Sequence, residues 1–256
     1  MSSPFSLGEM PFTSHLEELR TRLIRTILVV SVLSIVAYYW ADDLFALLTH
    51  PLRLALPSVS VIGTGPAEAF IVKLEISFAA GVIVSSPWWS YELWAFISPG
   101  LHLHEKKLAV PFVLATTLCF LFGVFFCFTM VLPYAFGFFL QEYQSIGALP
   151  NIRMEEYLSF VIKLVLVFGG VFEAPVISYF LARLGIVKSA WLLHHSRMAI
   201  VVIFIIAAIF TPPDVVTQCL LAVPMMFLYG LCIFVTQFAE KSAPKKEAAA
   251  DAAPRD

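Results

Sequence analysis

Charge is scarce in this sequence. Only 13% of its 256 residues are Asp, Glu, Lys or Arg, whereas 60% are hydrophobic and the mean hydropathy is +0.87. A soluble domain of this length does not need so much apolar surface, and long uncharged runs are typical of membrane spans. The scarcity of charge therefore excludes an ordinary soluble domain and favours a polytopic membrane protein.

Recognisable motifs of catalysis and metal binding are also missing. No HExxH, GxSxG, P-loop or GxGxxG pattern occurs, and the pairs His102/His104 and His194/His195 lack the i,i+4 spacing of helical metal ligands. The four cysteines form no CxxC pair and all lie in apolar segments, so packed thiols are expected rather than a disulfide or metal site. We expect no enzymatic activity, no cofactor, no metal and no nucleic-acid partner.

The first residues of the chain lack the pattern of a signal peptide, and the last residues lack large apolar side chains. Positions 1–19 contain no Lys or Arg and no small-x-small site follows the first apolar run, so a cleavable signal peptide is not expected. Ser242–Asp256 has no large apolar residue and is typical of a disordered tail. With no internal repeat, the expected organisation is one transmembrane domain over residues 1–240 and a disordered cytoplasmic tail over 241–256.

Six apolar segments fill most of the chain, and the basic residues fall almost entirely on one side of them. The segments are Arg22–Trp40, Ala69–Ile97, Leu108–Phe139, Tyr157–Leu181, Met198–Phe210 and Val215–Phe238. If the N-terminus is cytoplasmic, the inner side holds twelve of the 16 Lys and Arg residues, and the outer side holds Arg53 and Arg153. By the positive-inside rule, we predict an all-α protein with six transmembrane helices and both termini in the cytoplasm.

Segment length and proline positions predict an irregular bundle. Met198–Phe210 has 13 residues, about 20 Å of helix against a hydrocarbon core of about 30 Å. The turn at Thr211–Asp214 follows at once, and Pro224 is expected to interrupt segment six. These short fifth and sixth helices predict a concave face and a locally thin bilayer.

The other expected features are kinks, one helix start and one loop. We predict kinks at Pro87, Pro111 and Pro133. Ser14–Glu17 has the form of a capping box that opens the first helix. Asp42–Glu68, with its prolines and glycines, is expected to be an outer loop without a span.

Charged residues inside the apolar segments are the first candidates for function, because burying charge in a membrane is costly. Glu173, in Phe172–Val176, could be a protonated or internally paired residue that fixes helix packing, or a polar group facing a water-filled concavity. Lys73 and Glu75 lie near the outer end of segment two and Lys163 near that of segment four. Snorkelling to the interface is the simplest expectation for these three.

Two acidic residues stand among the inner basic ones. Glu18 could form an i,i+4 ion pair with Arg22, and Glu105 could be a favourable carboxylate at the start of the third segment. Glu17 is explained by the predicted capping box. Residue chemistry alone leaves open whether Glu18 and Glu105 are structural or bind a cationic ligand.

Several motifs in their order along the chain resemble the TatC family of the twin-arginine translocase. The resemblance covers about Pro11 to Phe238. It is carried by Phe12–Leu23, Ser86-Pro87, Trp94–Leu101, Glu105, Ser159-Phe160, Phe172–Val176, Thr211–Val215, Thr217-Gln218, Leu220–Ala222 and Pro224-Met225. The family has six spans with both termini inside and a short fifth and sixth helix, in agreement with the predicted topology.

This resemblance implies a receptor and core subunit that exports folded precursors bearing twin-arginine signal peptides, driven by the protonmotive force across a bacterial cytoplasmic (inner) membrane. The expected signal-binding residues are Leu16, Glu17, Glu18, Arg20, Phe96 and Glu105, and Pro51 belongs to a functionally sensitive loop. The single-span partners TatA and TatB are expected near Glu173, Thr211, Asp214 and Gln218, in a larger complex that holds several copies of this chain.

The residues leave two alternative functions. A proton-coupled secondary transporter would use Glu173 as its proton-linked group, but the chain has no repeat symmetry and no discontinuous helix pair near the midplane. An intramembrane hydrolase would need a nucleophile and base in one segment, and no such pair is present. Transport of a small solute into proteoliposomes would distinguish the first alternative.

Overall fold

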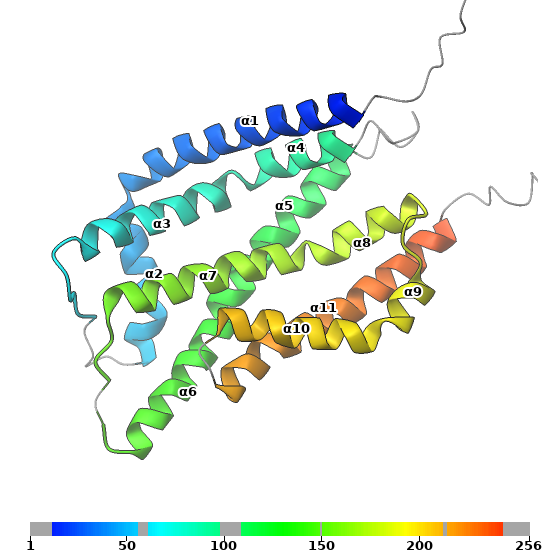
Figure 1. Cartoon of the computed structure of the whole chain (residues 1–256). Coiled ribbons are helices and arrows are strands. Elements are labelled where there is room, and N and C mark those ends of the chain that lie inside the picture. The colour runs from blue at the N-terminus through cyan, green and yellow to red at the C-terminus, as the bar shows by residue number, and fades with distance from the viewer. Residues whose placement is uncertain (1–11, 56–60, 98–108, 149, 212–213, 243–256) are drawn as a thin grey trace, which may run out of the picture.

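The computed structural model describes residues 12–55, 61–97, 109–148, 150–211 and 214–242, and these form a bundle of helices (Figure 1). The helices are α1 (Phe12–Tyr38), α2 (Ala41–Ala55), α3 (Glu68–Val84), α4 (Ser86–Ile97), α5 (Ala109–Phe126), the π-helical turn η3 (Cys127–Val131), α6 (Leu132–Ser145), α7 (Met154–Phe172), α8 (Ala174–Arg183), α9 (Ser189–His194), α10 (Ser196–Phe210) and α11 (Val215–Ser242). Within the described ranges the only β-pairing is an isolated bridge between Ile62 and Arg153. The all-α prediction is therefore confirmed.

The long apolar helices coincide with the predicted segments. Four stretches are long and apolar enough to cross a membrane: Leu16–Tyr38, Val110–Ser145, Met154–Arg183 and Val215–Lys241. The pair α3 and α4 forms a fifth candidate if its two helices count as one bent span. Helix α10 is the remaining apolar helix, with 15 residues. The chain is thus a multi-pass membrane protein whose fifth apolar segment is short, as predicted.

Three of the breaks in these helices lie beside prolines. The axis bends by 56° between α3 and α4, next to Pro87, and the π turn η3 ends immediately before α6, which carries Pro133 in its first turn. Helices α7 and α8 meet at Glu173, two residues before Pro175. A proline lacks the N–H needed for an i→i−4 bond, so the ladder is interrupted at these points.

One proline prediction and two local predictions are wrong. Pro224 lies inside α11, which continues unbroken from Val215 to Ser242. Pro111 is the third residue of α5, and the kink expected there stays a prediction. Helix α1 already includes Phe12, so the Ser14–Glu17 capping box does not open it. Asp42–Glu68 holds no span, as expected, but its first half forms α2 despite Pro51. Helix α2 is amphipathic and buries Leu52, so packing outweighs the breaker residue there.

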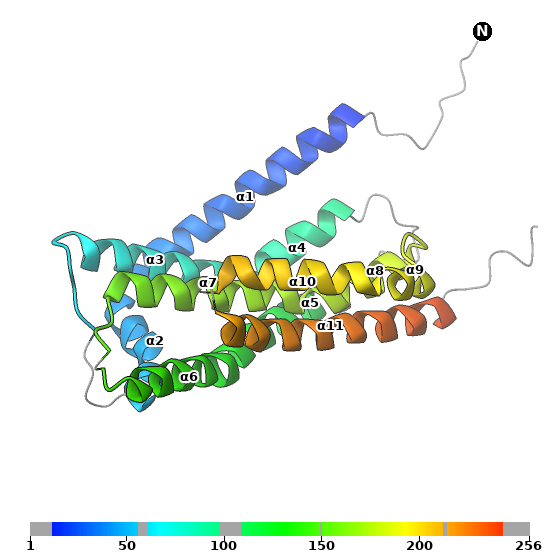
Figure 2. The same ribbon diagram turned by 60° about the horizontal axis from the view of Figure 1, so that its bottom comes forward.

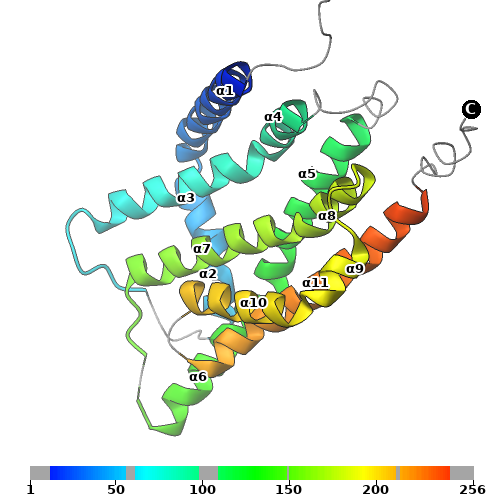
Figure 3. The same ribbon diagram turned by 45° about the vertical axis from the view of Figure 1, so that its right-hand side comes forward.

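Helix α7 lies in the middle of the bundle, between α3 on one side and α10 and α11 on the other (Figures 1 and 3). Its buried face includes Leu158, Val161, Leu164 and Phe168, each at most 1% exposed. These side chains join one core cluster with buried residues from α3, α6 and α11. A smaller cluster of Trp94, Ala95, Phe112 and Phe180 fixes α4 against α5 and α8.

Helix α1 is peripheral, and α4 is the helix that follows it away from the bundle in Figure 2. Helix α1 approaches α3 closely at Gly81 of α3, where an added Cβ would lie 2.2 Å from Ser34 Oγ and 2.8 Å from Ser34 N of α1. Glycine is therefore required for this approach of the two backbones. Because α4 continues from α3, this contact also sets the distance between α1 and α4.

The bundle has two chemically different ends. The start of α1, the ends of α4 and α8, helix α9 and the end of α11 gather at one end, on the right of Figure 1. The basic residues Arg20, Arg22, Arg25, Arg183, Lys188, Arg197 and Lys241 belong to these parts of the chain. We call this the inner end, following the charge rule, and the opposite end the outer end.

Candidate functional site at the inner end

A cluster of two glutamates and one arginine joins α1 to α4. Arg22 Nη2 lies 2.6 Å and Arg22 Nε 3.1 Å from Glu18 Oε1, and Arg22 Nη1 lies 3.0 Å from Glu92 Oε2. The Glu92 side chain is 5% exposed, whereas those of Glu18 and Arg22 are 24% and 21% exposed. A buried carboxylate needs such a partner, because an isolated charge in this setting is costly.

The sequence produces this cluster through helix geometry. Glu18 and Arg22 are four residues apart on α1 and face the same side of it. The bend between α3 and α4 aligns α4 with α1, so Glu92 reaches the guanidinium from the second helix. Two carboxylates share one cation, which leaves the cluster with a formal charge of −1.

The residues predicted for signal binding lie on the same two helices as this cluster where the structure describes them. Leu16, Glu17 and Arg20 are exposed on α1, and Phe96 is half-buried on α4, one turn beyond Glu92. Glu105 lies outside the described residues. The i,i+4 pair of Glu18 with Arg22, one of the two expectations for this residue, is present. Arg22 also pairs with Glu92 of α4, so the Glu18–Arg22 pair joins two helices and is more than a surface ion pair.

Glu92 is a member of this cluster that sequence reasoning missed. It lies within the apolar segment Ala69–Ile97, and a charged residue inside a span is itself a signal of function. That rule singled out Lys73 and Glu75 in the same segment and should have included Glu92. Lys73 instead pairs with Asp42 at 2.7 Å, and Glu75 accepts a hydrogen bond of 2.8 Å from Ser159.

The polar residues of the α10–α11 hairpin hold the hairpin together. Thr211 Oγ1 donates to the Ala207 carbonyl at 2.9 Å, and Gln218 Nε2 donates to the Phe204 carbonyl at 3.0 Å, which joins α11 to α10. Asp214 caps α11 by accepting bonds from the backbone N–H and the hydroxyl of Thr217. Pro212 and Pro213 lie outside the described residues.

Glu173 sits at the α7–α8 break and is 6% exposed. In the described part of the chain, neither of its carboxylate oxygens has a hydrogen-bond partner. Of the two expectations for this residue, exposure to an open concavity does not fit its low exposure, and a protonated or internally paired residue that fixes helix packing stays a prediction. Its internal pairing partner is not found among the described residues.

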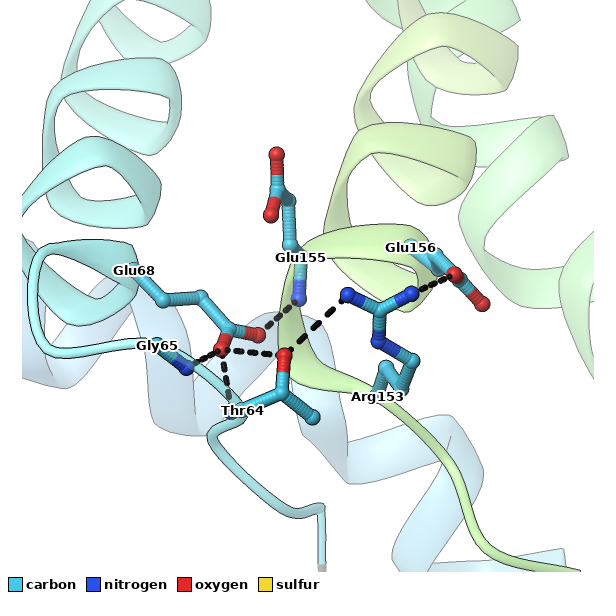
Figure 4. A network of polar contacts seen from close by, with 6 residues as sticks. All are labelled: Thr64, Gly65, Glu68, Arg153, Glu155 and Glu156. Carbon is cyan, nitrogen blue, oxygen red and sulfur yellow. Dashed lines mark hydrogen bonds and ion pairs between the residues drawn. The ribbon is translucent and has the colours of Figure 1, made fainter.

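The outer end carries a second glutamate network that the sequence did not indicate. Glu68, 4% exposed, accepts hydrogen bonds from Thr64 N, Thr64 Oγ1 and Gly65 N in its own loop, and from Glu155 N at 3.0 Å across the gap to α7 (Figure 4). Arg153 donates to Thr64 Oγ1 at 3.1 Å and pairs with Glu156 at 2.6 Å. We call these residues the outer clasp. Pro51 lies near the same end, buried in α2.

Comparisons with known proteins agree with this architecture. The chain matches the model of the family described as Sec-independent protein translocase protein (TatC) over residues 14–224. A protein of that name from Desulforapulum autotrophicum is 42% identical over 244 residues, which cover 94% of this chain and 90% of the relative. One from Aquifex aeolicus is 38% identical over 239 residues, covering 93% of this chain and 98% of the relative.

A solved structure is similar over nearly the same range. The crystal structure of a twin-arginine translocase receptor, TatC, superposes with a TM-score of 0.82 at 38% sequence identity, covering 88% of this chain and 99% of that one. The family consists of protein-transport components rather than enzymes, and its translocase contains other subunits. The chain therefore belongs to the TatC family and is a core subunit of a Sec-independent, twin-arginine protein translocase.

Proposed function

We propose that the inner-end cluster of Glu18, Arg22 and Glu92, together with Glu105, binds the paired arginines of twin-arginine signal peptides. Leu16, Glu17, Arg20 and Phe96 surround this site and contact the rest of the signal. The observation that supports this most is the pair of carboxylates already arranged around one guanidinium, that of Arg22. A site that holds an internal arginine in this way has the acceptors needed for an external one.

The geometry also explains a preference for arginine over lysine. A guanidinium is a planar fork that donates two parallel hydrogen bonds to a carboxylate, and an ammonium cannot reproduce this arrangement. An exposed ion pair contributes about 1 kcal/mol at most, whereas hydrogen bonds to a charged group contribute about 1.5–3 kcal/mol. The partial burial of Glu18 and Arg22 places the site nearer the second range.

The test is a titration of the purified protein with a fluorescent twin-arginine peptide. Glu18→Gln and Glu105→Gln should each weaken binding about tenfold, which corresponds to about 1.4 kcal/mol. Glu17→Gln is the comparison variant, because Glu17 is an exposed neighbour on the same helix that is proposed to contact the signal outside the arginine pair. Its loss should weaken binding clearly less than tenfold. Equal losses in the Glu17 and Glu18 variants would contradict the proposal, since they would reflect net charge alone.

We further infer six crossings with both termini in the cytoplasm of a bacterial inner membrane. The support is the gathering of the basic residues at one end of the bundle. Single cysteines in a background without the native four, labelled by an impermeant maleimide in intact cells, test this. Residues 58 and 147 should react from outside and residues 104, 194 and 248 should not. Labelling of residue 248 from outside would overturn the orientation.

We also infer that TatA- and TatB-type single-span subunits pack against the α10–α11 hairpin, in an assembly that contains more than one copy of this chain and is driven by the protonmotive force. Helix α10 presents many exposed apolar side chains, such as Ile205 and Ile209, beside the polar Thr211 and Gln218. Glu173 and Asp214 fix the helix break and the turn behind this surface. Cross-linking from position 205 to a partner subunit tests the contact, with exposed Leu118 on α5 as the control position.

A further inference from the structure

A polar cavity of about 480 Å³ opens beside the outer half of α7, where α10 ends. Its polar lining comes from Arg153, Glu155, Glu156, Ser159 and Lys163 of the α7 region and from Thr211 after α10. Helix α10 stops well short of the outer start of α7 in both Figures 1 and 2. The bundle is therefore stepped at this place, beside an apolar helix of only 15 residues that is too short for an unperturbed bilayer.

Lys163 is the residue in this cavity that needs a partner. It lies nine residues after Met154, about 13 Å further along the helix axis, and its side chain is exposed. Within the described ranges its ammonium group takes part in no ion pair or hydrogen bond. A lysine at this depth in a span is costly unless it meets an anion or reaches the interface, and neither the family resemblance nor the inner-end site gives it a role.

The charges along the cavity are ordered. At its outer edge stand two carboxylates, Glu155 and Glu156, and the single cation Arg153, which pairs with Glu156 at 2.6 Å. The Glu155 carboxylate points away from Glu68 in Figure 4, while its backbone N–H serves the outer clasp. One negative charge is thus in excess at the outer edge, and the positive charge of Lys163 lies deeper.

We propose that this cavity binds the headgroup of a zwitterionic phospholipid that carries a primary ammonium group. In such a lipid the negative phosphate lies nearer the acyl chains, at the depth of the positive Lys163. The positive ammonium lies nearer the water, at the outer edge where the negative charge of Glu155 and Glu156 is in excess. The phosphate accepts hydrogen bonds from Lys163, and the ammonium donates to the carboxylates of Glu155 and Glu156.

An anionic headgroup fits this cavity less well. Ser159, in the cavity wall, donates to Glu75 Oε2 at 2.8 Å, so a third carboxylate lies directly behind the lining. With that residue included, the acids outnumber Arg153 and Lys163. A lipid without a cation would meet uncompensated repulsion, and like charges in close contact are unfavourable.

The experiment measures lipid retained by the full chain. The protein is reconstituted in vesicles of equal parts phosphatidylethanolamine and phosphatidylglycerol, extracted in mild detergent and examined by native mass spectrometry. Phosphatidylethanolamine should be retained about fivefold over phosphatidylglycerol, and Lys163→Gln should reduce its retention about fivefold, the range of a partly exposed ion pair. Glu155→Gln should lower the preference for phosphatidylethanolamine while the clasp, which uses its backbone, stays intact.

Lys73→Gln is the matched control, since Lys73 is another lysine near the outer end of a span but already pairs with Asp42 at 2.7 Å. It should leave lipid retention unchanged. Replacing phosphatidylethanolamine by phosphatidylcholine, whose trimethylated ammonium cannot donate hydrogen bonds, should weaken retention. Unchanged retention in Lys163→Gln, or retention of phosphatidylglycerol at least as strong as that of phosphatidylethanolamine, would overturn the proposal.

Discussion

Both ends of this bundle bury a glutamate, but the two glutamates are satisfied by different kinds of donor. At the outer end, Glu68 accepts bonds from three backbone N–H groups and one hydroxyl, all fixed by the chain itself. At the inner end, Glu92 is held by the guanidinium of Arg22, on a side chain that can turn to another acceptor. The first arrangement ties the loop before α3 to the start of α7 through backbone groups. The second depends on a flexible side chain, which would let the proposed binding site exchange partners.

The largest effect is expected from removing the outer clasp. Glu68→Ala leaves the N–H groups of Thr64, Gly65 and Glu155 without their acceptor, which should lower the free energy of unfolding by about 3 kcal/mol. Thermal unfolding in detergent measures this loss. Glu155→Ala is the control, because only its backbone serves the clasp, and it should change stability by less than about 0.5 kcal/mol. A Glu68 variant as stable as the parent would show that the hydrogen bonds to Glu68 do not stabilise the outer end.

A change at Gly81 should disturb both stability and binding. In Gly81→Ala the new Cβ would lie 2.2 Å from Ser34 Oγ, so α1 must move away from α3, at a cost of about 1–3 kcal/mol. Because Glu18 is on α1 and Glu92 follows α3, peptide affinity should fall as well. Gly230→Ala in α11, where an added Cβ meets nothing within 4 Å, should leave both quantities nearly unchanged. A stable Gly81 variant with weak binding would show that α1 can move freely.

The proposed exchange of partners in the inner-end cluster predicts opposite effects for changes at Glu92 and at Arg22. Glu92→Gln removes the excess negative charge and should weaken binding of a twin-arginine peptide about tenfold, or about 1.4 kcal/mol. Arg22→Gln instead leaves two carboxylates without their internal cation and should bind the peptide at least as tightly as the parent. Fluorescence titration of both variants, with unfolding curves to confirm that they fold, checks the pair. A tenfold loss in Arg22→Gln would mean that the cluster is purely structural.

Glu173 belongs to neither class, since its carboxylate has no partner in the described part of the chain. Glu173→Gln keeps its shape and should change the free energy of unfolding by less than about 0.5 kcal/mol. Glu173→Ala leaves a cavity at the α7–α8 break and should cost about 1–3 kcal/mol, because the site is 6% exposed. Comparison of the two unfolding midpoints decides this, and equal losses would point to a hydrogen bond that the glutamine cannot make.

Patterns local in sequence predicted most of the fold. The apolar segments predicted the long helices and the short α10, and two of the prolines expected to cause kinks, Pro87 and Pro133, lie at breaks. Pro224 was misjudged because neighbouring helices support α11 through it. Pro51 was misjudged in the same way, since the packing of Leu52 outweighs it.

The candidate site was predicted only in part, for a physical reason. Glu18 and its pairing with Arg22 depend on positions four residues apart, which a helix model gives directly. Contacts across 70 residues, as from Arg22 to Glu92, or across 87, as from Glu155 to Glu68, depend on how helices pack. No single-sequence periodicity encodes these distances, although the intramembrane charge of Glu92 was visible and could have been used.

The measurement that tests the account most directly is a cycle between the protein and the signal. Affinities of a twin-arginine peptide and its twin-lysine variant are measured for the parent and for Glu18→Gln. If the Glu18 carboxylate accepts hydrogen bonds from a guanidinium of the signal, replacing the two arginines by lysines should lower peptide affinity less in Glu18→Gln than in the parent. The two losses of binding free energy should differ by at least about 0.5 kcal/mol. Penalties that simply add would contradict the account, because they would mean that Glu18 only holds Arg22 in place.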